Sequence, residues 1–463
     1  MEAMTVRELL EATGGVSLGG FSHWEKTVTS VETDSRAIHP GALFVALRGE
    51  RTDGHRYIAT ALESGAAGCL TEEVPETLDN DKFYIKVPDT MVAIGQVARA
   101  YKARFPIPVV GITGSVGKTT TKDMVASVLG AKYRVLKTEG NFNNELGLPL
   151  TLFRLSRKDE ICVLEMGMNH FGEIDYLTSL VCPDVAVMTN IGDSHIENLG
   201  SRENILKAKS EIFHYMKPGS LAVLNGDDPL LRGLEGKITP SIIFCGADHH
   251  PPYQAKSIQQ LGAQGMKCTV HTPERAFEVT VPALGSHMIY PVLISCVIGE
   301  HFGLNEEELI RGIHAFVPTK MRMNVLHQGE VTILDDAYNA NPQSIGAALE
   351  VLSQSGGTKR VAILGDMFEL GSLGPELHYS VGEYAGNVGN IDVLLAVGEL
   401  ARNIYEGAKA SHVPAVYYAK DKAEAKALLP QLIQPGAVVL AKASRGMAFE
   451  ELVREVRRLA PEG

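Results

Sequence analysis

From about residue 107 onward the sequence repeats one unit, in which a short apolar, β-branched run ends in Gly, Asn or Asp and precedes a helix-like segment. Near-continuous apolar strands that alternate with helices are typical of a parallel sheet covered on both faces. In such sheets, ligands bind beyond the carboxyl ends of the strands. Polar residues directly after the runs, such as Lys118, Glu165 and His195, are therefore candidates for a functional site. The runs are PVVGIT (108–113), ICVLEM (161–166), DVAVMTNI (184–191), SLAVLN (220–225), VTILDD (331–336), RVAILGD (360–366), DVLLAVG (392–398) and AVVLAKA (437–443).

The sequence predicts an α/β protein of several domains, because single hydrophobic cores stop growing well below 463 residues. The first part combines short strand signals with turn-rich stretches, which indicates a small α+β module. One boundary falls near Val87, and a second near Phe316, where AFVPTK interrupts a helix-like stretch. We therefore expect domains over residues 1–86, 87–316 and 317–463.

Charge and cysteine usage exclude several classes of protein. The chain has 43 Lys and Arg against 55 Asp and Glu, a net charge of −12, which argues against nucleic-acid binding. The segment MEAMTVRELLEATGG lacks the basic and apolar parts of a secretory signal. The apolar stretch 288–299 is too short to span a bilayer. Six scattered cysteines without a CxxC pair are typical of reduced thiols. We expect a cytoplasmic protein without a membrane span.

The segment VVGITGSVGKTTTKDM places a strand, a Gly-rich turn, Lys118, Thr119 and a helix in order. Such a turn lets backbone N–H groups approach phosphate oxygens, while the lysine bridges the outer phosphates and the threonine hydroxyl can ligate Mg²⁺. Ile112 stands where the strict GxxxxGK[ST] pattern has its first glycine, so the loop reads Gly114-x-x-Gly117-Lys118-Thr119. A glycine-rich turn without a ligand is the alternative, and the flanking strand and helix favour a nucleotide site.

Other polar positions are expected beside this loop. Glu165 ends a strongly apolar strand, where a carboxylate can hold Mg²⁺ as well as face solvent. His195 also follows a buried-type strand, and the residues support a functional role and a hydrogen-bonded structural role about equally. Asn141, Asn143 and Asn144 form an amide cluster that either satisfies its own backbone or binds a ligand.

The segment ENILKAKSEIFHYM predicts one helix with an unusual lysine. At 100° per residue, Ile205 and Ile212 share an apolar stripe and Lys209 lies near its middle, whereas Lys207 and Glu211 point away. One interpretation is a long side chain that covers apolar surface and keeps its amine in water. The other is a lysine held away from bulk water, with a partly neutral, chemically usable amine.

Two polar motifs follow strands in the last third of the chain. DDAYNANPQS carries Asp335, Tyr338 and Asn339, and AKASRGMAFEEL carries Ser444 and Arg445. The carboxylate could accept a ribose hydroxyl, the ring could stack on a purine, and the serine–arginine pair could bind a carboxylate. For the first motif, the alternative is an Asx-turn and N-cap cluster that starts a helix.

The chain resembles the Mur ligases over essentially its whole length, and most closely the branch that adds D-alanyl-D-alanine. The resemblance implies a module for a uridine nucleotide, a central P-loop ATPase domain with a mostly parallel sheet, and a C-terminal Rossmann-like domain. It implies that ATP phosphorylates the terminal carboxylate of UDP-N-acetylmuramoyl-tripeptide, and that the amine of D-alanyl-D-alanine then displaces phosphate, in peptidoglycan precursor synthesis. The segments that carry it are TDSRAIHPGALFVALRG, DGHRY, GITGSVGKTTTKDM, GNFNNELGLPLTL, EMGMN, NIGDSHIENLGS, AKSEIF, LNGDDP, DDAYNANPQS, GDMFELG and KASRGM.

The resemblance also implies roles for individual residues, including two Mg²⁺ sites and a CO₂-derived carbamate on one lysine. The expected catalytic residues are Lys118, Glu165, His195 and Lys209. The expected ATP contacts are Gly114, Ser115, Val116, Gly117, Lys118, Thr119, Thr120, Arg322, Asp335 and Asn339. The expected substrate contacts are Ser35, Arg36, Asn141, Asn144, Ser444 and Arg445, of which the first two bind the uridine diphosphate and the last two the dipeptide. The expected metal ligands are Thr119, Glu165, His195 and Lys209 as the carbamate.

One segment departs from the family. Relatives have Gly-x-His-Asn with a second Asn three residues later, one of them near the adenine, whereas this chain has Met288 and Pro291 at those places. The departure concerns base recognition and not the phosphate chemistry.

Three alternatives compete with this interpretation. Another amide ligase of the superfamily, such as a folylpolyglutamate synthetase-like enzyme, is disfavoured by the DSR…DGHRY and DDAYNANP segments. A non-catalytic nucleotide-binding scaffold is disfavoured because the phosphate-loop and metal-site residues are present together. A P-loop kinase or GTPase would leave the terminal motifs unexplained. The third residue of the acceptor peptide stays open, and we expect a monomer.

Overall fold

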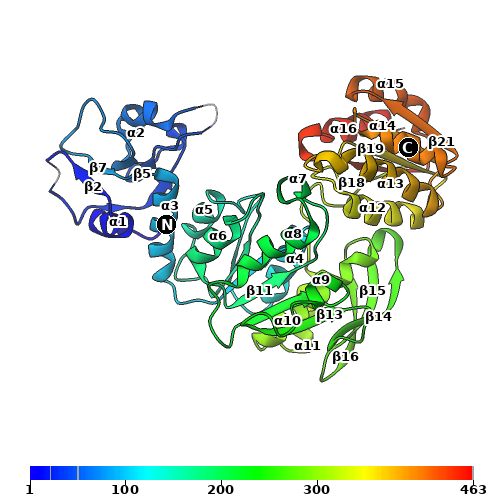
Figure 1. The fold of residues 1–463 in the computed structure, drawn as a ribbon, viewed down its shortest axis with the longest axis horizontal. Helices are drawn as coiled ribbons and strands as arrows, with labels where there is room; N and C mark the ends of the chain where they lie inside the picture. Colours follow the sequence, from blue (N-terminus) through cyan, green and yellow to red (C-terminus); the bar gives the residue numbers. More distant parts are fainter. Residues whose placement is uncertain (21, 50–51, 461–463) are drawn as a thin grey trace.

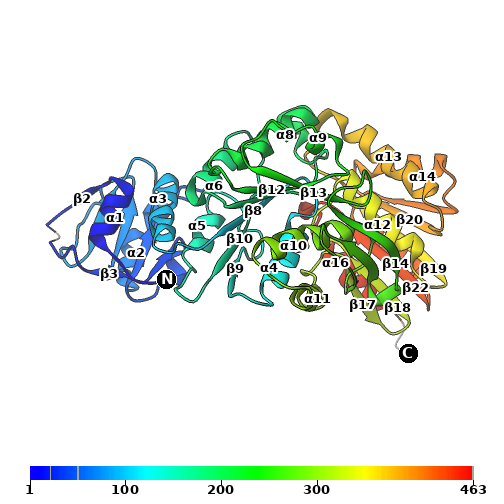
Figure 2. The same ribbon diagram turned by 90° about the horizontal axis from the view of Figure 1, so that it is seen from below.

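The structure, a computed structural model, describes residues 1–20, 22–49 and 52–460. Three sheet-containing parts follow one another along the molecule, with the N-terminal and C-terminal parts at opposite ends and the central part between them (Figures 1 and 2). The predicted α/β architecture with mostly parallel sheets is confirmed, and each of the eight apolar runs forms a strand. Within the described ranges, no helix is both long and apolar enough to cross a bilayer.

The N-terminal part is built on a five-stranded sheet in the order β2–β7–β6–β5–β4, with β4 to β7 parallel and β2 antiparallel at one edge. Helix α3 (Thr90–Ala103) joins it to the central part, since the buried Tyr101 hydroxyl of α3 donates to the Leu155 carbonyl at 2.6 Å. The other elements are β1 (Met4–Thr5), α1 (Val6–Thr13), β2 (Val16–Leu18), β3 (Thr27–Val28), β4 (Ser30–Glu32), β5 (Ala42–Val45), α2 (Ile58–Glu63), β6 (Gly68–Thr71) and β7 (Phe83–Lys86).

The central part is built on a nine-stranded sheet in the order β16–β15–β14–β13–β12–β11–β8–β10–β9, parallel from β9 to β14 and antiparallel from β14 to β16. Its strands are β8 (Val109–Thr113), β9 (Val135–Lys137), β10 (Ile161–Glu165), β11 (Val185–Met188), β12 (Leu221–Asn225), β13 (Ser241–Gly246), β14 (Tyr253–Gln260), β15 (Met266–His271) and β16 (Ala276–Val281). Its helices are α4 (Lys118–Leu129), α5 (Gly147–Leu152), α6 (Glu173–Val181), α7 (Ile196–Leu199), α8 (Arg202–Ser210), α9 (Pro229–Arg232), α10 (Ile289–His301) and α11 (Glu306–His314).

Helices cover both faces of the parallel strands. Val110 and Ile112 of β8 belong to one core cluster, together with residues of α4, α10 and α11. Val109 of the same strand belongs to the other cluster, together with residues of α6 and α8. Successive residues of a strand point to opposite faces, so burial on both sides explains why the run is continuously apolar. The polar residues of this region are thereby restricted to the strand ends.

The C-terminal part contains a six-stranded sheet in the order β17–β18–β22–β19–β20–β21, parallel except for β17. Strand β22 comes last in the chain but lies between β18 and β19. The strands are β17 (Asn324–Gln328), β18 (Val331–Asp335), β19 (Lys359–Gly365), β20 (Val393–Val397), β21 (Ala415–Ala419) and β22 (Ala437–Lys442). The helices are α12 (Pro342–Gln354), α13 (Gly374–Asn387), α14 (Ala401–Ala410), α15 (Lys422–Leu432) and α16 (Glu450–Leu459).

The segment between α11 and β17 is anchored at both of its ends. The Thr319 hydroxyl donates to the Asp123 carboxylate of α4, which also pairs with Lys122 and Lys137. At the other end, the Met323 N–H donates to the Asp336 carboxylate, just after β18, at 3.1 Å. The central and C-terminal parts are therefore connected through two acidic side chains.

Candidate functional site

The loop between β8 and α4 has the backbone of a phosphate-binding turn. Gly114 has φ 144°, and a Cβ atom there would lie 1.9 Å from the Thr189 hydroxyl, so only glycine fits. Gly117, with φ 81°, caps the N-terminus of α4, where the unpaired N–H groups and the helix dipole favour an anion. The Lys118 amine donates to the Gly114 carbonyl at 2.9 Å and thus folds back over the loop.

The segment after β11 holds this loop in place. The Ser115 and Val116 N–H groups donate to the Asn190 backbone carbonyl and side-chain oxygen, at 3.0 and 2.9 Å. The Thr189 hydroxyl donates to the Val116 carbonyl at 2.6 Å. Asn190 lies inside the predicted run 184–191, and it falls after the strand only because β11 ends at Met188, so the sequence does not identify it as a strand-end residue.

A cavity of about 540 Å³ opens over the loop, between the central and C-terminal parts. It brings together most of the predicted site residues. Those that line it are Ser115, Val116, Gly117, Lys118, Thr119, Thr120, Glu165, His195, Arg322, Asn339, Ser444 and Arg445. Seven others are not among the described residues of its wall, namely Ser35, Arg36, Gly114, Asn141, Asn144, Lys209 and Asp335.

Glu165 presents a carboxylate oxygen without a partner beside the loop. Its Oε1 accepts from the Asn143 amide at 2.8 Å, while its Oε2 is buried and has no hydrogen-bond partner among the described residues. A buried, unpaired carboxylate oxygen is costly unless a cation binds it. Asn143 is therefore the member of the amide cluster that holds the carboxylate. Asn144 instead accepts from the N–H of Gly147, the first residue of α5, at 2.8 Å.

His195 connects the central and C-terminal parts. Its Nδ1 lies 2.6 Å from Glu369 Oε2. Both residues have a left-handed backbone, with φ 65° and 63°. The nearby His195 lowers the pKa of Glu369 below its ordinary value, against an opposing effect of burial. Sequence reasoning missed this pairing, because nothing in the sequence places the two strand ends together.

Lys209 is buried as predicted, with 1% of its surface exposed, whereas Lys207 is exposed. Among the described residues, its amine makes no hydrogen bond or ion pair. Burial, and more weakly the nearby Lys118, lowers the pKa of Lys209 well below its ordinary value. The prediction for Glu211 is wrong, because α8 ends at Ser210 and a 3₁₀ turn turns the Glu211 carboxylate inward, where it accepts from backbone N–H groups at the start of α6.

The C-terminal wall of the cavity is organised by a buried ion pair. Lys442, 2% exposed, pairs with the Asp336 carboxylate and donates to the Asn339 carbonyl at 3.0 Å. Asp336 lines the cavity and Asp335 does not, in line with the alternation of side chains at a strand end. Burial raises the pKa of Asp335. The Arg322 guanidinium stacks on the Tyr338 ring, 4.1 Å from its centre.

Ser444 and Arg445 follow β22 at the same edge. The Ser444 hydroxyl accepts from the Phe368 N–H at 2.8 Å, which fixes the turn after β19 against the turn after β22. Arg445 is half-exposed and pairs with Glu450 at 2.9 Å. The Arg445 guanidinium can therefore release the Glu450 carboxylate and pair instead with the carboxylate of a ligand that enters the cavity.

Ser35 and Arg36 lie in the N-terminal part, away from this cavity, in a 3₁₀ turn after β4. Arg36 is exposed and pairs with Asp34, which lowers the pKa of Asp34 to about 2. The carboxyl ends of β4 to β7 meet at this edge.

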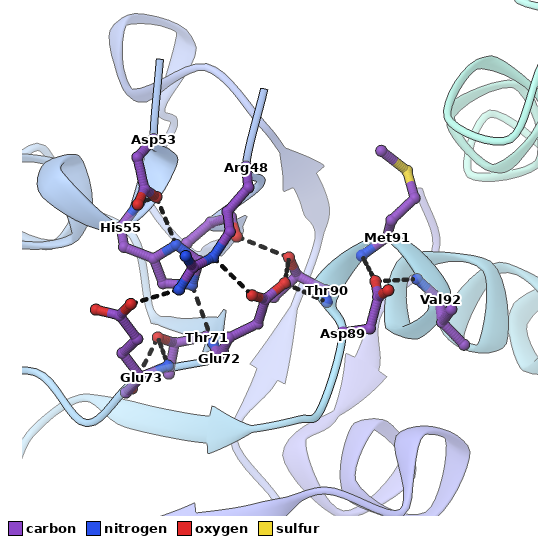
Figure 3. Close-up of polar contacts among 11 residues, drawn as sticks. Arg48, Asp53, His55, Thr71, Glu72, Glu73, Asp89, Thr90, Met91 and Val92 are labelled. Carbon is purple, nitrogen blue, oxygen red and sulfur yellow. Dashed lines mark hydrogen bonds and ion pairs between the residues drawn. The ribbon is translucent and has the colours of Figure 1, made fainter. Parts of the chain in front are cut away.

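A polar network occupies the same edge of the N-terminal sheet (Figure 3). Arg48 pairs with Glu72 and Glu73, and Glu72 also accepts from the Thr90 N–H at 3.0 Å, at the start of α3. His55 accepts from the Glu72 N–H at 3.0 Å through Nε2 and contacts Asp53 at 2.7 Å through Nδ1. The network ties the turns after β5 and β6 to α3. In the sequence, its DGHRY segment stands out only through the family resemblance.

Comparisons with known proteins agree along the whole chain. Three family descriptions match: "Mur ligase family, catalytic domain" over residues 27–102, "Mur ligase middle domain" over 112–299, and "Mur ligase, glutamate ligase domain" over 321–445. The chain is 38% identical to the UDP-N-acetylmuramoyl-tripeptide–D-alanyl-D-alanine ligase of Bacillus subtilis, with 98% of each chain covered, and 33% identical to that of Escherichia coli, with 99% of each covered.

Solved structures give the same result. A crystal structure of MurF from Acinetobacter baumannii superposes with a TM-score of 0.91 at 31% identity, covering 99% of both chains. MurF ligase from Thermotoga maritima in complex with ADP has a TM-score of 0.83 at 28% identity, covering 93% of this chain and 97% of that one. With matches of this identity and coverage, the chain belongs to the Mur ligase family.

Proposed function

We propose that the chain is an ATP-dependent ligase that joins D-alanyl-D-alanine to UDP-N-acetylmuramoyl-tripeptide through an acyl phosphate, as a step of peptidoglycan precursor synthesis. The observation that carries the proposal is one cavity, in which the phosphate loop with Lys118 and Thr119 faces Ser444 and Arg445 of the C-terminal part. A phosphate-binding loop and a carboxylate-binding arginine are the two groups that this reaction has to bring together. The names of the full-length relatives support the same substrates.

In the first step, a carboxylate oxygen of the tripeptide attacks the γ-phosphorus of ATP, and ADP leaves. The two reactants repel each other, so the Lys118 amine beside the loop is assigned to steady the transferring phosphoryl group. Burial lowers the pKa of Lys118, while the nearby Glu165 raises it. An entering triphosphate adds negative charge and therefore favours the ammonium form.

In the second step, the amine nitrogen of D-alanyl-D-alanine attacks the acyl carbon and loses a proton. The bond between that carbon and the phosphate oxygen breaks, and phosphate leaves with the bonding electrons. We assign Arg445 to binding the carboxylate of the dipeptide, and Ser444 to fixing the turn that carries Arg445. The cavity lies between two parts of the molecule, so the acyl phosphate can be kept from water while the amine enters.

The residues present fit Mg²⁺: Thr119 and Glu165 would hold one ion, and His195 and Lys209 would hold a second. The described residues contain no group of three or more His, Cys, Asp or Glu side chains that could hold a metal ion. This agrees with Mg²⁺, which is commonly held by one or two carboxylates together with substrate phosphates and water. When bound, the metal would screen the charge between the triphosphate and the carboxylate.

Lys209 suits a metal site only in a modified form. An ammonium would repel a cation, whereas a carbamate is anionic and offers two oxygens. CO₂ adds to a neutral amine, and the low pKa of Lys209, caused first by burial, favours the neutral form.

The test is phosphate release with UDP-N-acetylmuramoyl-tripeptides that carry diaminopimelate or lysine at the third position. We expect release that requires ATP, one of the tripeptides and D-alanyl-D-alanine together, and the preferred tripeptide identifies the third residue. Glutamate in place of the dipeptide serves as the control for another amide ligase of the superfamily. Release with glutamate, or no release that depends on the dipeptide, would contradict the proposal. We further expect the protein to act in the bacterial cytoplasm. We also expect a monomer, which light scattering on the purified protein tests.

A further inference from the structure

Thr119 and Glu165 both line the cavity, but they belong to different elements. Thr119 is the second residue of α4, and Glu165 is the last residue of β10. The amide of Asn143 orients the Glu165 carboxylate, yet this contact does not involve α4. Mg²⁺ requires near-ideal octahedral geometry, with its ligands at about 2.0–2.1 Å. Two ligands on separate elements can therefore share one ion only if the spacing of those elements is fixed.

Thr138 holds the end of β10 from one side. Strand β9 ends at Lys137, just before the level of Glu165 in the sheet. The next residue, the fully buried Thr138, still donates its N–H to the Val163 carbonyl of β10 at 3.1 Å. Its hydroxyl then accepts from the Glu165 N–H at 3.0 Å. A side-chain oxygen thus continues the ladder where the strand has ended, and it holds the backbone of Glu165.

Lys122 connects α4 to the same threonine. It follows Thr119 by three residues, on the same face of the helix, and only 2% of its surface is exposed. Its amine donates to the Thr138 carbonyl at 2.8 Å and lies 3.1 Å from the Asp123 carboxylate, which compensates the buried charge. Thr138 is therefore bonded to α4 through its carbonyl and to β10 through its hydroxyl.

These hydrogen bonds fix the spacing of the two elements more narrowly than the core does. Val125 of α4 and Val163 of β10 belong to one apolar cluster, but apolar contacts are non-directional. Hydrogen bonds are directional, and a buried one is costly to break because it leaves an unpaired polar group. The two bonds of Thr138 are buried, so they resist a shift of α4 relative to Glu165.

We propose that Lys122 and Thr138 are positioning residues, which set the gap between Thr119 and Glu165 and thereby determine how tightly the chain holds Mg²⁺. The inference rests on the proposed function, which assigns Thr119 and Glu165 to one ion. Neither positioning residue contacts the ion itself in this assignment. Mutation of a residue that orients a metal ligand typically weakens metal binding by about 10–100-fold, which sets the size of the expected effect.

The experiment measures binding of a non-hydrolysable ATP analogue, adenosine 5′-(β,γ-methylene)triphosphate, by titration calorimetry, once with Mg²⁺ and once with EDTA. The ratio of the two dissociation constants reports how much the metal strengthens binding. Thr138→Val keeps the shape of the side chain but removes the hydroxyl, and we expect it to reduce this ratio by at least about tenfold. The constant in EDTA should stay nearly the same, because the phosphate loop is unchanged. A smaller reduction of the ratio would overturn the inference.

Lys122→Met tests the other half of the connection. It keeps most of the side-chain volume but removes the bond to Thr138, so it should reduce the ratio by a similar factor. Circular dichroism identifies a variant that does not fold, and the other variant then decides. Thr138→Ser, which keeps the hydroxyl, and Lys137→Met, which removes the other lysine paired with Asp123, are the matched controls and should keep the ratio of the unaltered chain.

Two further results would overturn the inference. One is a reduced ratio in either control, and the other is a folded test variant that loses binding in EDTA as well, since neither defect would be specific to the metal. Calorimetry with the analogue does not require ligation. An absence of dipeptide-dependent phosphate release therefore contradicts the proposed function, whereas an unchanged ratio in the test variants contradicts only the inference.

Discussion

The buried ion pair behind the cavity allows a quantitative prediction. Lys442 is 2% exposed and pairs with Asp336, which is itself buried. Replacing Lys442 with methionine keeps most of the side-chain volume but leaves the buried Asp336 carboxylate, among the described residues, with only the Met323 N–H as a donor. Removing one partner of a buried pair typically costs about 3–5 kcal/mol, because the remaining charge is uncompensated. We expect Lys442→Met to destabilise the C-terminal sheet by that amount.

Two further variants separate charge from packing. In Lys442→Met/Asp336→Leu the carboxylate is gone as well, so most of the loss should be recovered. Lys420→Met is the surface control: Lys420 pairs with Glu424 at 3.0 Å, but both side chains are largely exposed. Exposed pairs of this kind contribute less than about 1 kcal/mol, so this variant should be nearly neutral.

The assay is amide hydrogen exchange on β18 and β22, because a chain of several parts does not unfold in one step. The free energy of opening of these amides should fall by about 3–5 kcal/mol in Lys442→Met, while amides of the N-terminal sheet keep their protection. A loss no larger than that of Lys420→Met would refute the argument that Asp336 depends on this lysine.

Three other predictions concern the centre of the cavity. Lys118→Ala should lose ligation by at least about 10²-fold in kcat while keeping its circular dichroism spectrum, because it removes a charge that steadies the phosphoryl group; near-normal turnover would contradict the assignment. Lys209→Ala should be almost inactive and regain part of its activity with a short carboxylic acid, whereas the exposed Lys207→Ala should matter little; full activity of Lys209→Ala without an additive would refute the carbamate. His195 is the main cause of the lowered pKa of Glu369. A carboxyl whose pKa is lower in the folded than in the unfolded state stabilises the fold at pH values above the unfolded pKa, and this stabilisation is lost as the pH falls through the folded pKa. Melting of the protein between pH 3 and 6 should therefore depend less on pH in Glu369→Gln, and identical slopes would contradict this.

The sequence predicts the strands that are buried on both faces and misses those that are not. The eight apolar runs became strands because a continuous run has few other ways to be buried. Strands β14 to β16 were not predicted, since none of them forms a continuous apolar run. β14 is buried only over its first three residues, and the residues of β15 and β16 alternate between buried and more exposed positions. The limits of the three domains stay a prediction, because burial patterns alone do not say where one cooperative unit ends.

The site was predictable where it depends on strand ends and unpredictable where it depends on side-chain direction. Lys118, Glu165 and His195 follow buried strands and line one cavity. The sequence could not show which of Asp335 and Asp336 faces the cavity. Side chains alternate along a strand, so a shift of one residue in the strand end would make the other carboxylate face the cavity. The functional roles of all these residues stay predictions until the variants above are measured.

The position of β22 also bears on how the protein is made. During synthesis, β18, β19, β20 and β21 all leave the ribosome before β22, yet β22 is the strand that joins β18 to β19. Until it arrives, both of those strands present an unpaired edge, which is a template for pairing with another chain. The nascent C-terminal sheet is thus open along its middle, and it carries its greatest risk of aggregation just before β22 closes it. The same event places Ser444 and Arg445, so the cavity cannot be complete in a chain whose synthesis has stopped before β22.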